Sequence, residues 1–173
     1  MTFQPILTPR LRLRSLEPRD AVALSAYRSD PSVARFQSWS APYPESAALE
    51  LIDSTQTRDI TDIGWTQIGV ATFATDALIG DIGFNRIDSV TAEIGFTLAA
   101  THQGQGLMRE AVETLLNYAI QTGVQRITAT TDVRNAASQG LLTRLGFRLE
   151  QILRDSWLED GEFFDEYLYA FEL

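Results

Sequence analysis

The sequence predicts one α/β domain in which helices and strands share a mixed sheet. Three strand-like segments lie between residues 66 and 98, and short turns join them, as in an antiparallel meander. An amphipathic segment over residues 107–122 then predicts a crossover helix, and a strand, a second helix and two more strands follow it. A meander that continues through crossover helices indicates a mixed α/β sheet. The length of 173 residues suits a single domain.

One strand and two helices are predicted before the meander. Residues 11–14 alternate apolar and charged side chains, which predicts a strand with one wet face. A helix is predicted from Glu17 to about Arg28, with proline in its first turn, and another over residues 46–58. Residues 31–44 are rich in proline, serine and aromatic residues and predict a loop with at most a short helix. The meander strands are predicted at residues 66–74, 78–87 and 91–98.

The second half alternates helices and strands. The helix over residues 107–122 has apolar residues at intervals of three and four and ends at Gly123. A β-branched segment predicts a strand over residues 126–131, and a helix then runs from about residue 135 to Leu145, where Gly146 stops it. The last two strands are predicted at residues 147–157 and 163–172.

The composition excludes several kinds of chemistry. The chain contains no lysine and no cysteine, and all fourteen basic residues are arginine. Without lysine, neither a Walker A phosphate loop nor a lysine Schiff base can form. Without cysteine there is no thiolate nucleophile and no cysteine zinc site. The single histidine, His102, cannot build a His-rich centre, so no metal site is expected.

The charge distribution bears on partners and location. A net charge of −9 opposes binding to phosphate backbones, so no nucleic-acid partner is expected. Residues 149–173 carry one arginine and eight carboxylates, whereas residues 100–148 carry five arginines and three carboxylates. No stretch reaches the length of a membrane span, and the first ten residues lack a secretory-signal pattern. A cytoplasmic location without a membrane partner is therefore expected.

Gly104 and Gly106 lie between a predicted strand and the helix that begins at Leu107. Glycines at such a junction let backbone N–H groups approach a ligand closely, and the positive end of the helix faces the same point. Together they form a phosphate site that needs no side-chain cation. The dinucleotide fingerprint needs a third glycine where this chain has Arg109, which disfavours a Rossmann site. A turn that only caps the helix is the alternative.

The segment from Thr101 to Gly106, THQGQG, resembles the acetyl-CoA-binding motif Arg/Gln-x-x-Gly-x-Gly/Ala of the GNAT N-acetyltransferase superfamily. Residues 135–138 and 145–147 resemble the N-x-x-S and L-G-F signatures of its RimJ/RimL-like branch, which is named for acetylation of ribosomal-protein N-termini. The opening residues 7–14 resemble this branch too, and the element order matches over essentially the whole chain. Thr101 departs from the motif, which weakens one phosphate contact.

The resemblance implies a single GNAT domain over residues 8–173, of the α/β (α+β) class. Its mixed, mostly antiparallel sheet of seven strands would be flanked by about four helices. The sheet would splay between its fourth and fifth strands, which correspond to residues 91–98 and 126–131.

The resemblance also implies acetyl-CoA as cosubstrate, with its pantetheine arm in the splay. Backbone groups of Phe96, Thr97 and Leu98 would bond the pantetheine and acetyl groups, and Asn135 would face the arm. Backbone amides of the glycine turn would hold the pyrophosphate, from Gln103, Gly104, Gln105, Gly106, Leu107 and Met108.

The implied chemistry is direct attack of an amine on the thioester through a tetrahedral intermediate. Glu93 is the candidate base, because an acid near this position has that role in several relatives; the alternatives are a surface carboxylate and a water chain to another base. Ser138 is the candidate acid for the leaving thiolate, and a helix hydroxyl bonded to backbone is the alternative.

The predicted function is acetyl transfer to a primary amine, with a protein or peptide N-terminal α-amine as the preferred acceptor. A small-molecule amine is one alternative, and a non-catalytic acyl-CoA-binding protein is another. The acceptor would meet the first helices, the loop around Phe36, Trp39 and Tyr43, and the last hairpin. A homodimer is left open. The hairpin carboxylates that could attract a cationic acceptor are Asp155, Glu159 and Asp160.

Overall fold

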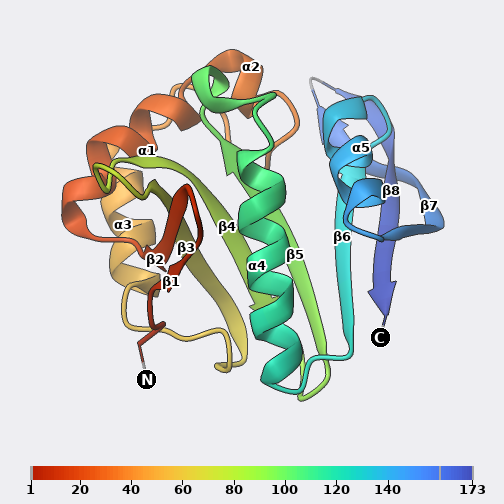
Figure 1. Cartoon of the computed structure of the whole chain (residues 1–173). Helices are drawn as coiled ribbons and strands as arrows, with labels where there is room; N and C mark the ends of the chain where they lie inside the picture. The colour runs from red at the N-terminus through yellow and green to blue at the C-terminus, as the bar shows by residue number, and fades with distance from the viewer. Residues whose placement is uncertain (1, 160, 173) are drawn as a thin grey trace.

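Eight strands form a single sheet in the computed structural model, which describes residues 2–159 and 161–172 (Figure 1). Their order is β1-β2-β3-β4-β5-β6-β8-β7, and every neighbouring pair is antiparallel except β5 and β6, which are parallel. The mixed, mostly antiparallel sheet is therefore confirmed. The strands are β1 (Ile6–Leu7), β2 (Leu11–Ser15), β3 (Gly64–Thr72), β4 (Leu78–Arg86), β5 (Thr91–Leu98), β6 (Arg126–Asp132), β7 (Arg148–Glu159) and β8 (Glu162–Glu172).

The sheet has one strand more than the seven expected. The additional strand is β1, which consists of only two residues and was not predicted. Ile6 and Leu7 pair with Leu13 and Arg12 of β2. Two residues cannot show the alternation by which a strand is recognised in a sequence, so only the pairing reveals this one. The seven predicted strands are confirmed as β2 to β8, with small shifts at their ends.

The described residues form five α-helices where about four were expected, because the segment over residues 31–44 contains the single-turn helix α2. Asp30 caps α2, since its side chain accepts a hydrogen bond from the Ser32 backbone N–H. Within the described ranges, no helix has the length and apolar character needed to cross a membrane. The helices are α1 (Ala21–Arg28), α2 (Pro31–Ala34), α3 (Glu45–Thr55), α4 (Leu107–Gln121) and α5 (Ala136–Arg144), with short 3₁₀ turns at Pro18–Asp20 and Ala100–His102.

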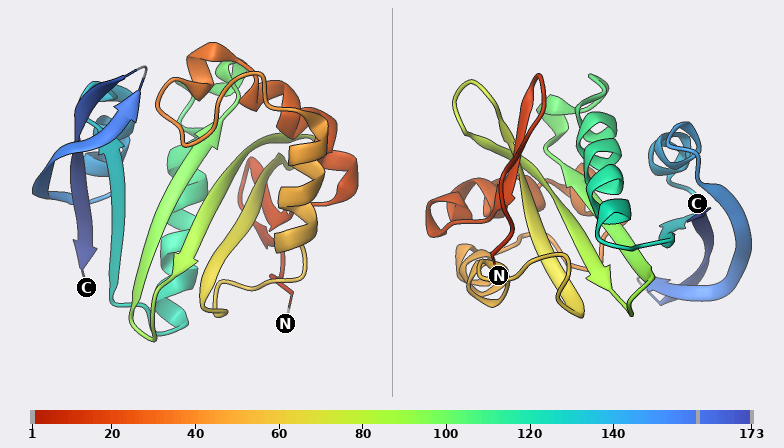
Figure 2. Two further views of the ribbon diagram at one scale, coloured as in Figure 1. Left: turned by 180° about the vertical axis from the view of Figure 1, so that it is seen from behind. Right: turned by 60° about the horizontal axis from the view of Figure 1, so that its bottom comes forward.

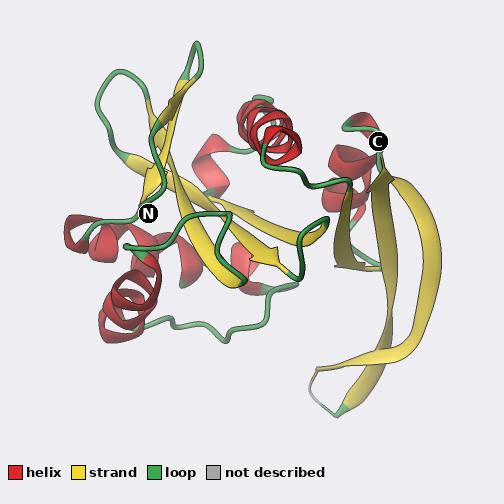
Figure 3. Ribbon diagram, turned by 90° about the horizontal axis from the view of Figure 1, so that it is seen from below, coloured by secondary structure: helices red, strands yellow, loops and turns green. Residues whose placement is uncertain are grey.

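The helices cover both faces of the sheet. Figures 2 and 3 show α1 and α3 on one face and α4 on the other, with α5 beside β6 and β8. The inner face of α4 contributes Ala111, Val112 and Leu115 to the main core, where they join sheet residues such as Ile82 and Phe84. A smaller core joins α1 to α3. Burial of these apolar faces, which the helical spacing predicted, holds the layers together.

The sheet divides between β5 and β6, as the family resemblance implied. Residues 91–93 pair with residues 126–128, and no pair follows along β5. Strand β6 continues to Asp132 against β8 instead. Figure 1 shows the two strands diverging toward the end of β5. Residues 94–98 therefore have β4 on one edge and no strand of the described chain on the other.

Candidate active site

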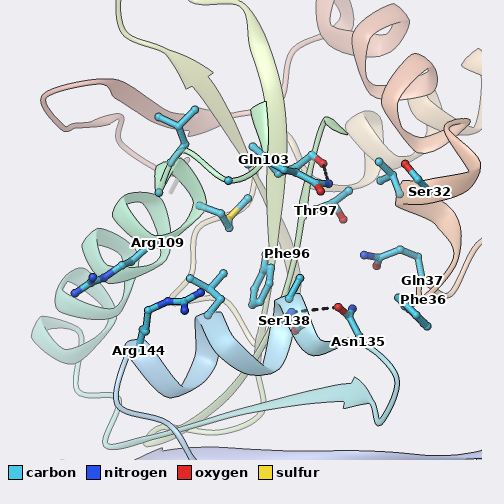
Figure 4. A pocket seen from close by; sticks show the side chains of 18 residues that line it. Ser32, Phe36, Gln37, Phe96, Thr97, Gln103, Arg109, Asn135, Ser138 and Arg144 are labelled. Carbon is cyan, nitrogen blue, oxygen red and sulfur yellow. Dashed lines mark hydrogen bonds between the residues drawn. The ribbon is translucent and has the colours of Figure 1, made fainter. Parts of the chain in front are cut away.

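A cavity of about 620 Å³ opens where β5 and β6 separate (Figure 4). Its wall comes from the end of β5, the glycine turn, the first turn of α4, helix α5 and the chain around α2. This volume lies within the range of small-molecule sites, roughly 300–1,000 Å³. Ten of the twelve predicted site residues line it, namely Phe96, Thr97, Leu98, Gln103, Gly104, Gly106, Leu107, Met108, Asn135 and Ser138.

The glycine turn presents an unusual row of free donors to this cavity. Gly104 and Gly106 both have φ of +73°, a left-handed backbone conformation that residues other than glycine rarely adopt. None of the backbone N–H groups over residues 104–109 donates to a described residue. They adjoin the positive end of α4, so the turn can hold a phosphate group by backbone alone.

Hydrogen bonds from Thr8 and Arg10 of the N-terminal segment hold the glycine turn in place. Glu110 accepts hydrogen bonds from Thr8 Oγ1 at 2.5 Å and from Arg10 Nε at 2.7 Å. Arg10 Nη1 in turn donates to the Gln105 carbonyl at 2.9 Å. Burial acts to raise the pKa of Glu110, but these donors outweigh it and lower that pKa. The opening segment therefore contributes to the site through contacts that its sequence pattern did not reveal.

Asn135 and Ser138 share a hydrogen bond at the start of α5. Asn135 caps the helix, since its Oδ1 accepts the Ser138 backbone N–H at 3.1 Å. The cap occupies the amide oxygen and leaves the Asn135 amide nitrogen able to donate toward the cavity. The Ser138 hydroxyl makes no hydrogen bond to the described chain, which leaves it free to face a ligand.

The two remaining predicted residues do not reach this cavity. Glu93 lies where β5 still pairs with β6, opposite Thr128, and outside the lining of the cavity. The Gln105 side chain turns back to the Thr101 carbonyl at 3.2 Å. A direct role for Glu93 beside the thioester site therefore has no geometric support, and its role as base stays a prediction that needs intervening water.

A second cavity of about 610 Å³, which the sequence did not predict, meets the first at Gln37, Phe96 and Thr97. It also touches Gly95 and the side chains of Trp39 and Trp65, which come from a loop and from β3. The residues shared by the two linings belong to β5 and to the segment after α2. The two cavities are therefore neighbours on either side of these residues.

Asp81 anchors the floor of the second cavity. It is fully buried, and its carboxylate accepts hydrogen bonds from Tyr27, Gln67 and Arg28, the last at 2.7 Å. Burial, and then the neighbouring carboxylate, raise the pKa of Tyr27 well above its usual value. Arg28 also stacks on Trp39, with its Cζ 4.0 Å from the ring centroid. The signal for this cluster was a lone carboxylate within the apolar β4 segment.

Arg134 connects the last hairpin to the rim of the first cavity. Its guanidinium binds Asp132 at 2.6 Å and Glu159 at 2.8 Å, and its Cζ lies 3.5 Å from the Phe164 ring centroid and 5.5 Å from that of Phe36. Burial alone would raise the pKa of Asp132, but the bonds from Arg134 lower it. The loop after α2 and the hairpin thus meet above the cavity.

The acidic hairpin is only partly available to an acceptor. The Glu159 carboxylate is occupied by Arg134, and the backbone N–H of Asp155 donates to Asp165 at 3.0 Å. Asp160 lies outside the described residues. Attraction of a cationic acceptor by these carboxylates stays a prediction.

The divided sheet, the row of free amides and the cavity between them match what the family resemblance implied for an acyltransferase that takes its acyl group from a coenzyme A thioester. A sequence profile described as Acetyltransferase (GNAT) domain matches residues 10–148. The chain therefore belongs to the GNAT acetyltransferase family, and it is an N-acetyltransferase with acetyl-CoA as cosubstrate.

Individual relatives agree with this assignment. Uncharacterized N-acetyltransferase p20 of Bacillus licheniformis is 33% identical over 172 residues, which are 97% of this chain and 96% of the relative. The ribosomal-protein-serine acetyltransferase of Escherichia coli is 39% identical over 101 residues, or 57% and 56% of the two chains. A RimL ribosomal alpha-N-protein acetyltransferase, solved with coenzyme A, superposes with a TM-score of 0.83 at 22% identity, over 98% of each chain.

Proposed function

We propose that this acetyltransferase modifies the α-amine at the N-terminus of a protein or peptide. The observation that carries the proposal is that the two cavities adjoin, since both linings include Phe96 and Thr97. Acetyl-CoA would lie along β5 in the first cavity, with its pyrophosphate on the free amides of residues 104–109. The acceptor chain would enter the second cavity and bring its terminal amine to the thioester at this junction. Such acceptors arise in the cytoplasm, where we also place the enzyme.

The reaction is a direct transfer. The amine nitrogen attacks the thioester carbonyl, a C–N bond forms, and the C–S bond breaks as the tetrahedral intermediate collapses. The negative oxygen of that intermediate needs fixed donors, which backbone N–H groups on the open edge of β5 would supply. No acyl-cysteine intermediate is available, because the chain contains no cysteine.

The lower pKa of an α-amine favours it as the acceptor over a lysine side chain, because more of it is neutral and able to attack. At a pKa of about 7.8, roughly one α-amine in seven is neutral at pH 7, against about one lysine side chain in 2,500. We assign the role of the modest base to Glu93. Its carboxylate lies outside the linings of both cavities, so it would act through water. Ser138 lies on the cavity wall with a free hydroxyl and would donate a proton to the departing thiolate.

The names of two relatives support a protein acceptor. The Escherichia coli relative is a ribosomal-protein-serine acetyltransferase, and the RimL structure is that of an alpha-N-protein acetyltransferase. A small amine would also fit a cavity of about 610 Å³, so the choice between the two acceptors is experimental.

A panel of acceptors with release of coenzyme A thiol as readout tests the proposal. The panel contains short peptides with free N-termini, the same peptides with blocked N-termini but a free lysine, and simple polyamines. We expect turnover with the free N-termini alone, and mass spectrometry should place the acetyl group there. Turnover only with polyamines would favour the small-molecule alternative. Binding of acetyl-CoA without turnover of any acceptor would favour the alternative of a non-catalytic acyl-CoA-binding protein.

A substitution at Gly95 tests the use of the second cavity. A Cβ at this position would meet no atom within 4 Å, so a larger side chain can enter the cavity without a backbone clash. Gly95→Leu should raise the acceptor KM at least tenfold and leave the Kd of coenzyme A unchanged. Gly95→Ala is the matched control with a small side chain. Unchanged acceptor kinetics in the leucine variant would place the acceptor elsewhere.

A further inference from the structure

Two arginines on the wall of the first cavity, which the proposed function assigns to the cofactor and which is called the cofactor cavity from here on, have no partner among the described residues. Arg109 comes from the first turn of α4, and Arg144 comes from the last turn of α5. Figure 4 shows both at the end of the cavity opposite to Phe36 and Asn135. Neither side chain donates a hydrogen bond or forms an ion pair within the ranges 2–159 and 161–172. Two guanidinium groups are thus available at one end of this cavity.

Most arginines of the described chain differ from Arg109 and Arg144, because they pair with a carboxylate. Carboxylates outnumber arginines 23 to 14, and eight of the arginines pair with a carboxylate in the described chain. The described lining of the cofactor cavity includes Arg109 and Arg144 but no aspartate or glutamate. The described wall of this cavity therefore carries two positive charges and no negative one, which favours an anionic ligand group.

We propose that Arg109 and Arg144 bind the 3′-phosphate of coenzyme A and make the enzyme selective for the 3′-phosphorylated cofactor. This inference rests on the cofactor placement given above. Coenzyme A carries two anionic groups, and the free amides of residues 104–109 already suit the pyrophosphate. The 3′-phosphate is the anion that remains, and it is carried on the ribose, beyond the pyrophosphate from the thioester.

The positions of the side chains agree with this assignment. Phe36, Asn135 and Ser138 mark the end of the cavity that adjoins the second cavity and the hairpin. The arginines mark the other end, so a cofactor with its thioester at the junction would direct its ribose toward them. Guanidinium forks bind phosphate through paired N–H donors, which suits a terminal phosphate approached from two helices.

Binding of two cofactor forms tests the proposal without any acceptor. Calorimetry would compare coenzyme A with 3′-dephospho-coenzyme A for the wild type, Arg109→Gln, Arg144→Gln and the double variant. Arg148→Gln is the matched control, because Arg148 is exposed on β7, unpaired in the described chain and outside the cavity, and its loss changes the net charge equally. Both target side chains are exposed, so the variants should fold.

We expect the wild type to bind coenzyme A at least tenfold more tightly than the 3′-dephospho form. Each single variant should lose about tenfold in affinity for coenzyme A, equivalent to about 1.4 kcal/mol, with little change for the 3′-dephospho form. The double variant should show no preference, the control should match the wild type, and added salt should reduce the preference.

Three results would overturn the inference. Equal losses for both cofactor forms would place the arginines on the pyrophosphate instead. A wild type that binds both forms equally would remove the 3′-phosphate contact. A wild type that binds neither form would refute the cofactor placement itself, whereas failure to find an acceptor would leave this binding comparison intact.

Discussion

Replacing Asp81 by asparagine should destabilise the protein by removing a buried charge while keeping its shape. The amide oxygen can still accept from Arg28 and Gln67, and the amide nitrogen can donate to the Tyr27 hydroxyl, which both donates and accepts. The Arg28 charge, on a side chain only 7% exposed, then has no buried counter-ion. Breaking a buried ion pair on one side costs about 3–5 kcal/mol.

The lower end of that range applies here, because the hydrogen bonds survive and Trp39 still stacks on Arg28. We therefore expect a loss of about 3 kcal/mol in the free energy of unfolding. With a urea m-value of about 2 kcal/mol/M, the midpoint should fall by about 1.5 M. Urea unfolding followed by circular dichroism measures this, and an unchanged m-value would show that only stability has changed.

A second variant separates charge from packing. Arg28→Met in the Asp81→Asn background removes the stranded cation, so the double variant should be more stable than Asp81→Asn alone. A midpoint shift below about 0.5 M for Asp81→Asn, or simple addition of the two single effects, would refute the view that this pair is coupled.

Three further predictions concern the turn, the acid and the effect of pH. Gly106→Glu should abolish coenzyme A binding, since it places a carboxylate on the free amides, whereas Gly123→Glu, at another left-handed glycine, should retain it in the same calorimetric assay. Ser138→Ala should lower kcat by roughly 10²-fold with the Kd of coenzyme A unchanged, while Glu93→Gln should shift the pH profile of kcat/KM; an unaltered rate or profile would dismiss that residue. The raised pKa of Tyr27 makes the unfolded chain release a proton above about pH 10 while the folded chain keeps it, so the free energy of unfolding should fall there by up to about 1.4 kcal/mol per pH unit. Tyr27→Phe should show a correspondingly shallower loss in alkaline urea titrations, and equal slopes would refute the assignment.

Local patterns were sufficient for most of the fold. The short turns of the meander and the apolar spacing of α4 are properties of neighbouring residues, so the sequence displays them directly. Strand β1 was missed because a two-residue strand exists only through its pairing with β2. The parallel β5–β6 contact and its early end came from family resemblance, since no local pattern encodes where two strands part.

The site divides in the same way. The roles proposed for Gly104, Gly106 and Asn135 depend on their own backbone geometry or on a helix cap, and such features leave recognisable motifs. The second cavity is assembled from α1, α3, β3, β4 and β5, and its charged floor joins residues up to 54 positions apart. No spacing rule links Tyr27 to Asp81, so only the folded chain brings them together.

The separation of β5 from β6 also leaves two strand edges with free hydrogen-bonding groups inside one molecule. Exposed edges of this kind invite pairing with other chains, which is why proteins usually cover them. The pantetheine arm carries two amide groups and can complete such an edge as an added peptide strand would. The cofactor would then be a temporary part of the sheet, and at 100 times its Kd it would stabilise the fold by about 2.7 kcal/mol. Bound acetyl-CoA would in this way cover the open edge of β5 as well as supply the acetyl group.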